Sequence, residues 1–121
     1  MTSAELEYRL IDFAVGCIKL TKTVVKSFAA EHMSGQLIRS STSSALNYSE
    51  SIGASSYRDY INKMQICLKE LRESKTNLII QSKSDFYEDN KATEYLIEEA
   101  NELVKIFSKS IATSKQNNKK I

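Results

Sequence analysis

The chain contains no proline and only three glycines, Gly16, Gly35 and Gly53, among its 121 residues. Folds made of short strands depend on these two residue types, because glycine and proline supply the backbone conformations of tight turns. Their scarcity argues against most all-β folds and predicts an all-α protein. The length corresponds to one domain, which we expect to span residues 1–121.

Cysteine is scarce as well. Cys17 and Cys67 each lie in an apolar helical pattern, with no second pair and without the spacing of metal ligands, so we expect both to be reduced core residues. No apolar run reaches the roughly 18 residues that a membrane span requires. The N-terminus lacks the basic and hydrophobic regions of a secretory signal. These features predict a cytoplasmic protein without membrane contact.

Catalytic and metal-binding patterns are missing too. The one histidine, His32, has no partner for triad or metal chemistry, and no Glu-x-x-His motif, glycine-rich phosphate loop or nucleophile with a spaced base occurs. We interpret the acidic pairs Glu98 with Glu102 and Glu70 with Glu73 as solvated helix surface. The sequence therefore predicts no catalytic, cofactor-binding or metal-binding residues and a protein that is not an enzyme.

The formal net charge of +2 is too small to indicate a nucleic-acid-binding protein by itself. The charges are nevertheless segregated, because residues 85–102 hold seven acids and one base, whereas residues 105–121 hold five lysines and no acid. Acids at the start and bases at the end of a helix complement its dipole. We favour this explanation over a dedicated binding patch.

Apolar residues recur at steps of three and four in four segments, which predict helices at about residues 4–30, 34–52, 56–81 and 91–113. The links between them are short, so successive helices should lie antiparallel. The expected fold is an antiparallel up-down-up-down four-helix bundle. Residues 114–121 are predicted to form a flexible basic tail.

The second helix has an unusual inner face made of small residues. Its stripe consists of Leu37, Ser41, Ala45 with Ser44 beside it, Tyr48 and Ile52. Because serine and alanine add little bulk, this helix should lie close to its neighbours, which must supply most of the buried volume.

Side chains that can cap the predicted helices precede each of them. The candidate N-caps are Ser3, Ser34 and Ser56 for the first three helices and Asn90 or Thr93 for the fourth. Gly53 is expected to end the second helix. The stretch Ser82 to Asn90 is expected to be a polar link.

Lys19, Lys22 and Lys26 are spaced to share one face of the first predicted helix. This row is interpreted as a solvated face or as an anion or nucleic-acid contact. The tyrosines Tyr8, Tyr48, Tyr57 and Tyr60 allow two readings as well, as an interface between copies or as half-buried rim residues.

Residues along the second and third helices resemble a known family. In the second helix, the matching positions are Gln36, Arg39, Ser43, Asn47, Tyr48, Ser49 and Glu50. In the third helix, they are Tyr60, Ile61, Ile66, Leu68, Leu71, Glu73, Thr76 and Leu78. The first helix matches in the run from Ile18 to Lys22. The pattern is similar to that of the small four-helix-bundle proteins encoded in intervening sequences of bacterial 23S rRNA genes. It departs from the family at Ile38, Ala45 and Ser51, where an arginine, a proline and a glycine are usual.

The resemblance implies a homopentameric ring of bundles. It also implies nucleic-acid binding or work with a nucleic-acid-handling protein, since the accessory variability determinant of diversity-generating retroelements binds nucleic acid and acts with a reverse transcriptase. The leading hypothesis is therefore a non-enzymatic oligomeric protein that contacts RNA, DNA or such a partner. The alternative is a protein–protein scaffold or regulatory partner without nucleic-acid contact.

The expected contact residues are basic, and a second set of polar residues is expected to be structural. The contact set is Lys19, Lys22, Lys26, Arg39, Lys115, Lys119 and Lys120. Asn47 and Glu50 are predicted to hydrogen-bond to Arg39, or to Glu73 and Thr76, and so to fix the register of the second and third helices.

Overall fold

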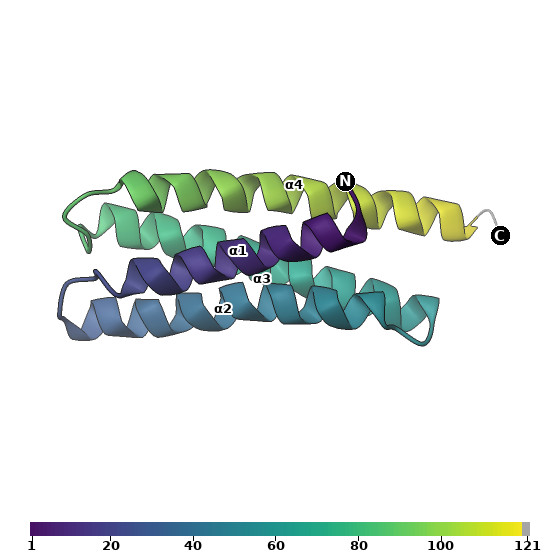
Figure 1. Ribbon diagram of the computed structural model, residues 1–121, viewed down its shortest axis with the longest axis horizontal. Coiled ribbons are helices and arrows are strands. Elements are labelled where there is room, and N and C mark those ends of the chain that lie inside the picture. Colours follow the sequence, from purple (N-terminus) through teal and green to yellow (C-terminus); the bar gives the residue numbers. More distant parts are fainter. Residues whose placement is uncertain (120–121) are drawn as a thin grey trace.

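The computed structural model describes residues 1–119, which form four helices and no strand. They are α1 (Ser3–Thr21), α2 (Phe28–Ile52), α3 (Tyr57–Lys83) and α4 (Lys91–Lys119). The helices run alternately up and down, each packs on the next, and α1 closes the bundle against α4 (Figure 1). The predicted all-α four-helix bundle is confirmed.

The first link begins nine residues and ends six residues earlier than predicted. α1 ends at Thr21 rather than near residue 30, and α2 begins at Phe28 rather than at 34. Ser27 is the N-cap, because its hydroxyl accepts a hydrogen bond from the Ala30 amide at 3.1 Å. The predicted cap, Ser34, is instead a buried residue of α2.

Apolar residues in this link explain the error. Val24 packs on the core, and the Val25 amide donates to the Phe86 carbonyl of the α3–α4 link at 3.0 Å. The Thr23 hydroxyl donates to the Leu20 carbonyl at 2.9 Å, which is a way for the chain to leave the helix. The link therefore continues the helical spacing of apolar residues without being helical.

The other helix ends differ less from the predictions. Thr2 rather than Ser3 caps α1 and forms a capping box with Glu5. Ser56 caps α3 as predicted, since its hydroxyl accepts from the Asp59 amide at 3.0 Å. Gly53 is the C-cap of α2, also as predicted.

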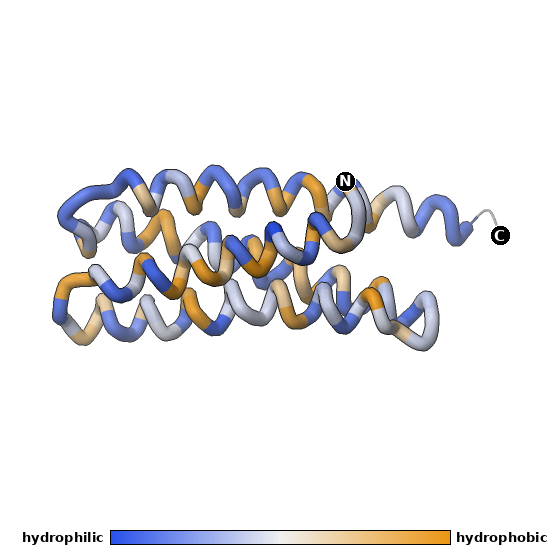
Figure 2. The backbone as a smooth tube through the Cα atoms, in the orientation of Figure 1, coloured by the Kyte–Doolittle hydropathy of each residue, from blue (hydrophilic) through white to orange (hydrophobic). Residues whose placement is uncertain are grey.

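α4 continues through the predicted flexible tail to Lys119. The sequence holds no proline and no glycine after Gly53, so nothing in residues 114–119 breaks the helix. This end of α4 extends past the other three helices (Figure 1), and its last turns are hydrophilic (Figure 2). Lys120, also predicted to lie in the tail, is outside the described residues.

The core is supplied mainly by α1, α3 and α4. Its fully buried large side chains include Leu10, Phe13, Met64, Leu71, Leu78, Leu103 and Phe107, and α2 contributes Leu37. The α3–α4 link was predicted to be polar, yet Phe86 and Tyr87 of this link are buried in the same core. Both cover the end of the bundle where the two links meet.

The small inner face of α2 is confirmed at Leu37, Ser41, Ser44 and Tyr48, which are buried. Ile52 was expected to continue this face but is 51% exposed, and Ser51 is buried in its place. The face is even poorer in bulk than predicted, because Ser34 and Ser40 are buried as well.

Hydrogen bonds satisfy most of these buried hydroxyls. Ser40 Oγ lies 2.7 Å from Ser74 Oγ of α3, and Ser44 donates to the Ser41 carbonyl at 2.7 Å. Cys67 Sγ donates to the Ser44 carbonyl at 3.2 Å. Small side chains that are hydrogen-bonded in this way let α2 and α3 pack closely while most of their buried hydroxyls are paired. Ser34 Oγ is buried and has no hydrogen-bond partner within residues 1–119.

α1 and α4 also meet through a small residue. A Cβ atom placed on Gly16 would lie 2.9 Å from Cδ2 of Leu96. The absence of a side chain at Gly16 thus gives Leu96 its position against α1.

Candidate functional site

The basic residues predicted to bind a partner lie in three separate places. Lys19 is in the last turn of α1, Lys22 is its C-cap and Lys26 is in the following link, so they do not form a row on one helix. The prediction of a shared helical face is wrong because α1 ends before Lys22. All three are exposed.

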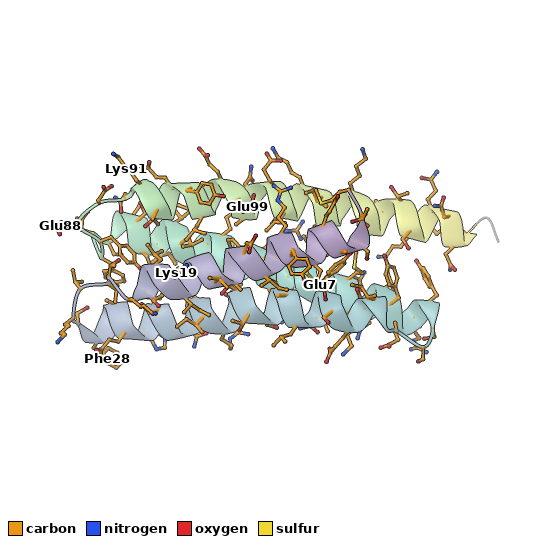
Figure 3. All side chains as sticks on the ribbon, viewed as in Figure 1. Glu7, Lys19, Phe28, Glu88, Lys91 and Glu99 are labelled. Atoms are coloured by element: carbon orange, nitrogen blue, oxygen red, sulfur yellow. The ribbon has the colours of Figure 1, made fainter. Side chains whose placement is uncertain are left out.

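Acidic residues share this end of the bundle. Glu88 of the α3–α4 link lies at the same end as Lys19 and Lys91 (Figure 3), and Asp85 and Asp89 belong to the same link. The charges here are therefore mixed, and the lysines do not form a field of one sign.

Arg39 is paired with carboxylates of α3. Its Nη1 donates to Glu70 Oε2 at 2.8 Å, and its Nη2 contacts Glu73. These hydrogen bonds, that to Glu70 first, raise the pKa of Arg39. The Glu70 side chain is only 6% exposed, so removal of the guanidinium would leave a nearly buried carboxylate without its partner. Arg39 therefore links α2 to α3.

The predicted hydrogen bonds of Asn47 and Glu50 do not form. Asn47 donates to the Ser43 carbonyl of its own helix at 2.9 Å, and Glu50 pairs with Lys63 at 3.0 Å. Glu73 instead contacts Arg39. Thr76 is exposed beside a groove between α2 and α3. The prediction was wrong because Asn47 bonds to Ser43 one turn earlier in α2 and Glu50 pairs with Lys63 of α3.

Glu70 was the residue that sequence reasoning missed. It was interpreted as solvated surface, yet it is buried against α2. Its spacing from Cys67 and Ser74, three residues after one and four before the other, places it on the inward face of α3, and this signal could have identified it.

The other end of the molecule carries a basic stripe on α4. Lys105, Lys109, Lys115 and Lys119 are all exposed. At 3.6 residues per turn they fall within about 120° of the helix circumference. No acid follows Glu102 in the sequence, and Lys105 reaches it only at 3.9 Å. We call these four lysines the α4 basic stripe.

The stripe lies beside an open end of the bundle. α1 begins where Ser3 Oγ meets Tyr48 Oη at 3.0 Å, whereas α4 continues well past this point (Figure 1). A groove remains between α3 and α4 at this end. It is lined by Met1, Tyr60, Ile106, Lys109, Ser110, Thr113, Ser114 and Asn117.

Three of the four predicted interface tyrosines gather at this end. Tyr48 is buried, with its ring edge-on to that of Phe107 at 5.4 Å, and burial raises the pKa of its hydroxyl. Tyr57 and Tyr60 are half-buried, and their rings are 6.4 Å apart. Tyr8 lies apart on α1 and is 67% exposed.

The residues considered for chemistry do not come together. His32 lies on the surface of α2, stacked on Phe28 with ring centroids 6.1 Å apart. Cys17 and Cys67 are buried free thiols, as predicted. Within residues 1–119, no group of three or more histidine, cysteine or acidic side chains is arranged to hold a metal ion.

Among the helices described for residues 1–119, none is both long and apolar enough to cross a lipid bilayer.

Comparison with known proteins gives matches that cover most of the chain. Residues 6–109 match the family described as 23S rRNA-intervening sequence protein. The fold is similar to the crystal structure of a protein of unknown function from the S23 ribosomal protein family of Bacteroides thetaiotaomicron VPI-5482. The TM-score is 0.82 and the identity 28%, over 93% of this chain and 99% of that one. No curated protein matches the sequence.

Proposed function

Since the chain belongs to the 23S rRNA-intervening sequence protein family, we propose that it is a non-enzymatic, homo-oligomeric bundle that contacts nucleic acid through the α4 basic stripe. The family assignment supports the bundle, and the contact with nucleic acid rests on the residues of this chain.

The α4 basic stripe is the observation that carries the proposal. Its four lysines are exposed on one side of a helix that extends beyond the bundle, and no acid follows Glu102. Phosphates bind to such rows through charge and the release of counterions. The family match ends at residue 109, so it does not include Lys115 and Lys119. Their support for the proposal is their exposure on α4, which does not depend on the family assignment.

The other predicted basic residues are weaker candidates. Arg39 already pairs with two carboxylates, and a phosphate would have to displace them. Lys19, Lys22 and Lys26 lie at the end of the bundle that also holds the acids of the α3–α4 link. We therefore place the contact on α4.

Self-association is supported by exposed apolar residues on α1. Tyr8, Ile11 and Val15 are spaced by three and four residues along its outer side and are 67%, 39% and 40% exposed. Tyr95 of α4 is 67% exposed beside the α1–α4 groove. Such an apolar surface favours burial against another chain. The family resemblance favours five copies, which would multiply the basic stripes and strengthen weak phosphate contacts.

Titration of a labelled RNA and a labelled DNA by fluorescence anisotropy tests the nucleic-acid contact. We expect binding at about 50 mM salt that weakens as salt is raised. Replacement of the four stripe lysines by glutamine should abolish it. The matched control replaces Lys19, Lys22 and Lys26 by glutamine and should retain binding.

Three outcomes would contradict the proposed contact. They are no binding by the wild-type protein at about 50 mM salt, unchanged binding by the stripe variant, and loss of binding confined to the control variant. Light scattering tests self-association, for which we expect a multiple of the 13.7 kDa chain mass. An oligomer that binds no nucleic acid would favour the alternative of a protein–protein scaffold, which the apolar surface of α1 also supports.

A further inference from the structure

The groove at the open end of the bundle differs chemically from the α4 basic stripe beside it. The inward face of α4 is apolar at Leu103, Phe107 and Ile111, but three residues further on it reaches Ser114. The lining contributed by this part of α4 also includes Ser110, Thr113 and Asn117. Beyond Ile111, the side chains of α4 that line the groove therefore carry hydroxyl and amide groups in place of the apolar groups of the core.

An aromatic residue of α3 lines the groove together with these polar groups. Tyr60 lines the groove, and Tyr57 packs beside it with ring centroids 6.4 Å apart and planes tilted by 42°. Tyr57 Oη is buried and has no hydrogen-bond partner in the described part of the chain. Tyr60 is itself half-buried, so its ring packs beside Tyr57 and also contributes to the groove lining.

Lys109 joins the groove to the basic stripe. It lines the groove together with Tyr60, and it follows Lys105 by one turn on the exposed side of α4. A ligand that occupies the groove can therefore place an anionic group on Lys109 while an uncharged, planar part lies against the tyrosine.

We infer that this groove takes an unstacked base of a single-stranded nucleic acid whose backbone follows the α4 basic stripe. A base offers a flat face for the Tyr60 ring and polar edges for serine, threonine and asparagine side chains. A duplex keeps its bases stacked and presents mainly phosphates, which the lysines alone could bind. The inference rests on the proposed function and adds that single strands are the preferred partner.

Binding of one labelled oligonucleotide, as a single strand and annealed to its complement, tests this preference at equal salt. The wild-type protein should bind the single strand about tenfold more tightly than the duplex, as expected when one base stacks on an aromatic side chain. Tyr60→Leu should weaken single-strand binding about tenfold and leave duplex binding unchanged. Tyr60→Phe, which keeps the ring, should bind as the wild type does.

Phe28→Leu is the matched control, because it removes an 86% exposed aromatic ring from the start of α2, at the opposite end of the bundle, and should change neither affinity. Circular dichroism of each variant checks that the bundle stays folded. Equal wild-type affinity for single strand and duplex would overturn the inference, and so would an unchanged Tyr60→Leu variant. In either of these two cases, the proposed function still stands if the replacement of the four lysines of the α4 basic stripe by glutamine abolishes binding to both single strand and duplex. Failure of the wild type to bind either form would overturn both.

Discussion

Arg9 of α1 and Glu99 of α4 are joined by two parallel hydrogen bonds. Arg9 Nε donates to Glu99 Oε2 and Nη2 donates to Oε1, both at 2.8 Å. The hydrogen bond to Glu99 is the main cause that raises the pKa of Arg9. Among neighbouring helices, α1 and α4 pack together least, and this pair links their side chains in addition to the contact of Leu96 with Gly16.

Replacing Arg9 by methionine or Glu99 by glutamine should therefore destabilise the bundle. The side chains are 30% and 18% exposed, and a forked arginine–carboxylate pair of this kind contributes about 1 kcal/mol. A double-mutant cycle measured by urea unfolding should return a coupling energy of that size. Glu98→Gln is the control, because Glu98 is an exposed carboxylate of the same helix and its replacement should change stability little. A coupling energy near zero for Arg9 and Glu99 would contradict the prediction.

The contact of Ser40 with Ser74 leads to a prediction about helix spacing. Both side chains are fully buried and their oxygens are 2.7 Å apart, so no space remains for larger groups. Ser40→Leu should lower the free energy of unfolding by about 2 kcal/mol or more through overpacking, whereas Ser40→Ala should cost about 1 kcal/mol. Urea unfolding measures both. Ser49→Leu, an exposed site on α2, should leave stability nearly unchanged. Equal effects of leucine at the two sites would argue against close packing.

Cys17 predicts how stability changes at alkaline pH. Burial raises the pKa of its thiol from 9.0 to about 12. In the unfolded chain the thiol loses its proton at the lower value, so between these two pH values the unfolded state binds fewer protons than the folded state. The free energy of unfolding should therefore fall as pH rises through this window. Below pH 9 the thiol is protonated in both states, so Cys17 causes no pH dependence of stability there.

Urea unfolding across this pH range measures the effect. The free energy of unfolding should fall less steeply with pH in the Cys17→Ala variant than in the wild type. Part of the slope should persist in that variant, because burial also raises the pKa of Tyr87 to about 12. A thiol reagent should label wild-type Cys17 only after denaturant is added. An unchanged slope in Cys17→Ala, or rapid labelling of the folded protein, would contradict the prediction.

The sequence by itself determined the fold class and most of the core. The period of three and four that carries Leu71, Leu78, Leu103 and Phe107 is a property of each helix, so it is visible without knowledge of the neighbours. The small residues of α2 were recognisable for the same reason. The spacing misled where Val24 continued it into a link, because an apolar residue can reach the core from a helix or from a turn.

Only the tertiary structure decided the features that join distant parts of the chain. Arg39 pairs with Glu70 because α2 and α3 lie side by side, and the basic residues near Lys19 and Lys119 lie at opposite ends because the helices alternate in direction. The groove beside Tyr60 lies where α4 continues past the other helices, and Met1, Tyr60 and α4 line it together. Relative helix lengths and contacts between residues far apart in sequence determine these features, and no periodicity within one helix records them.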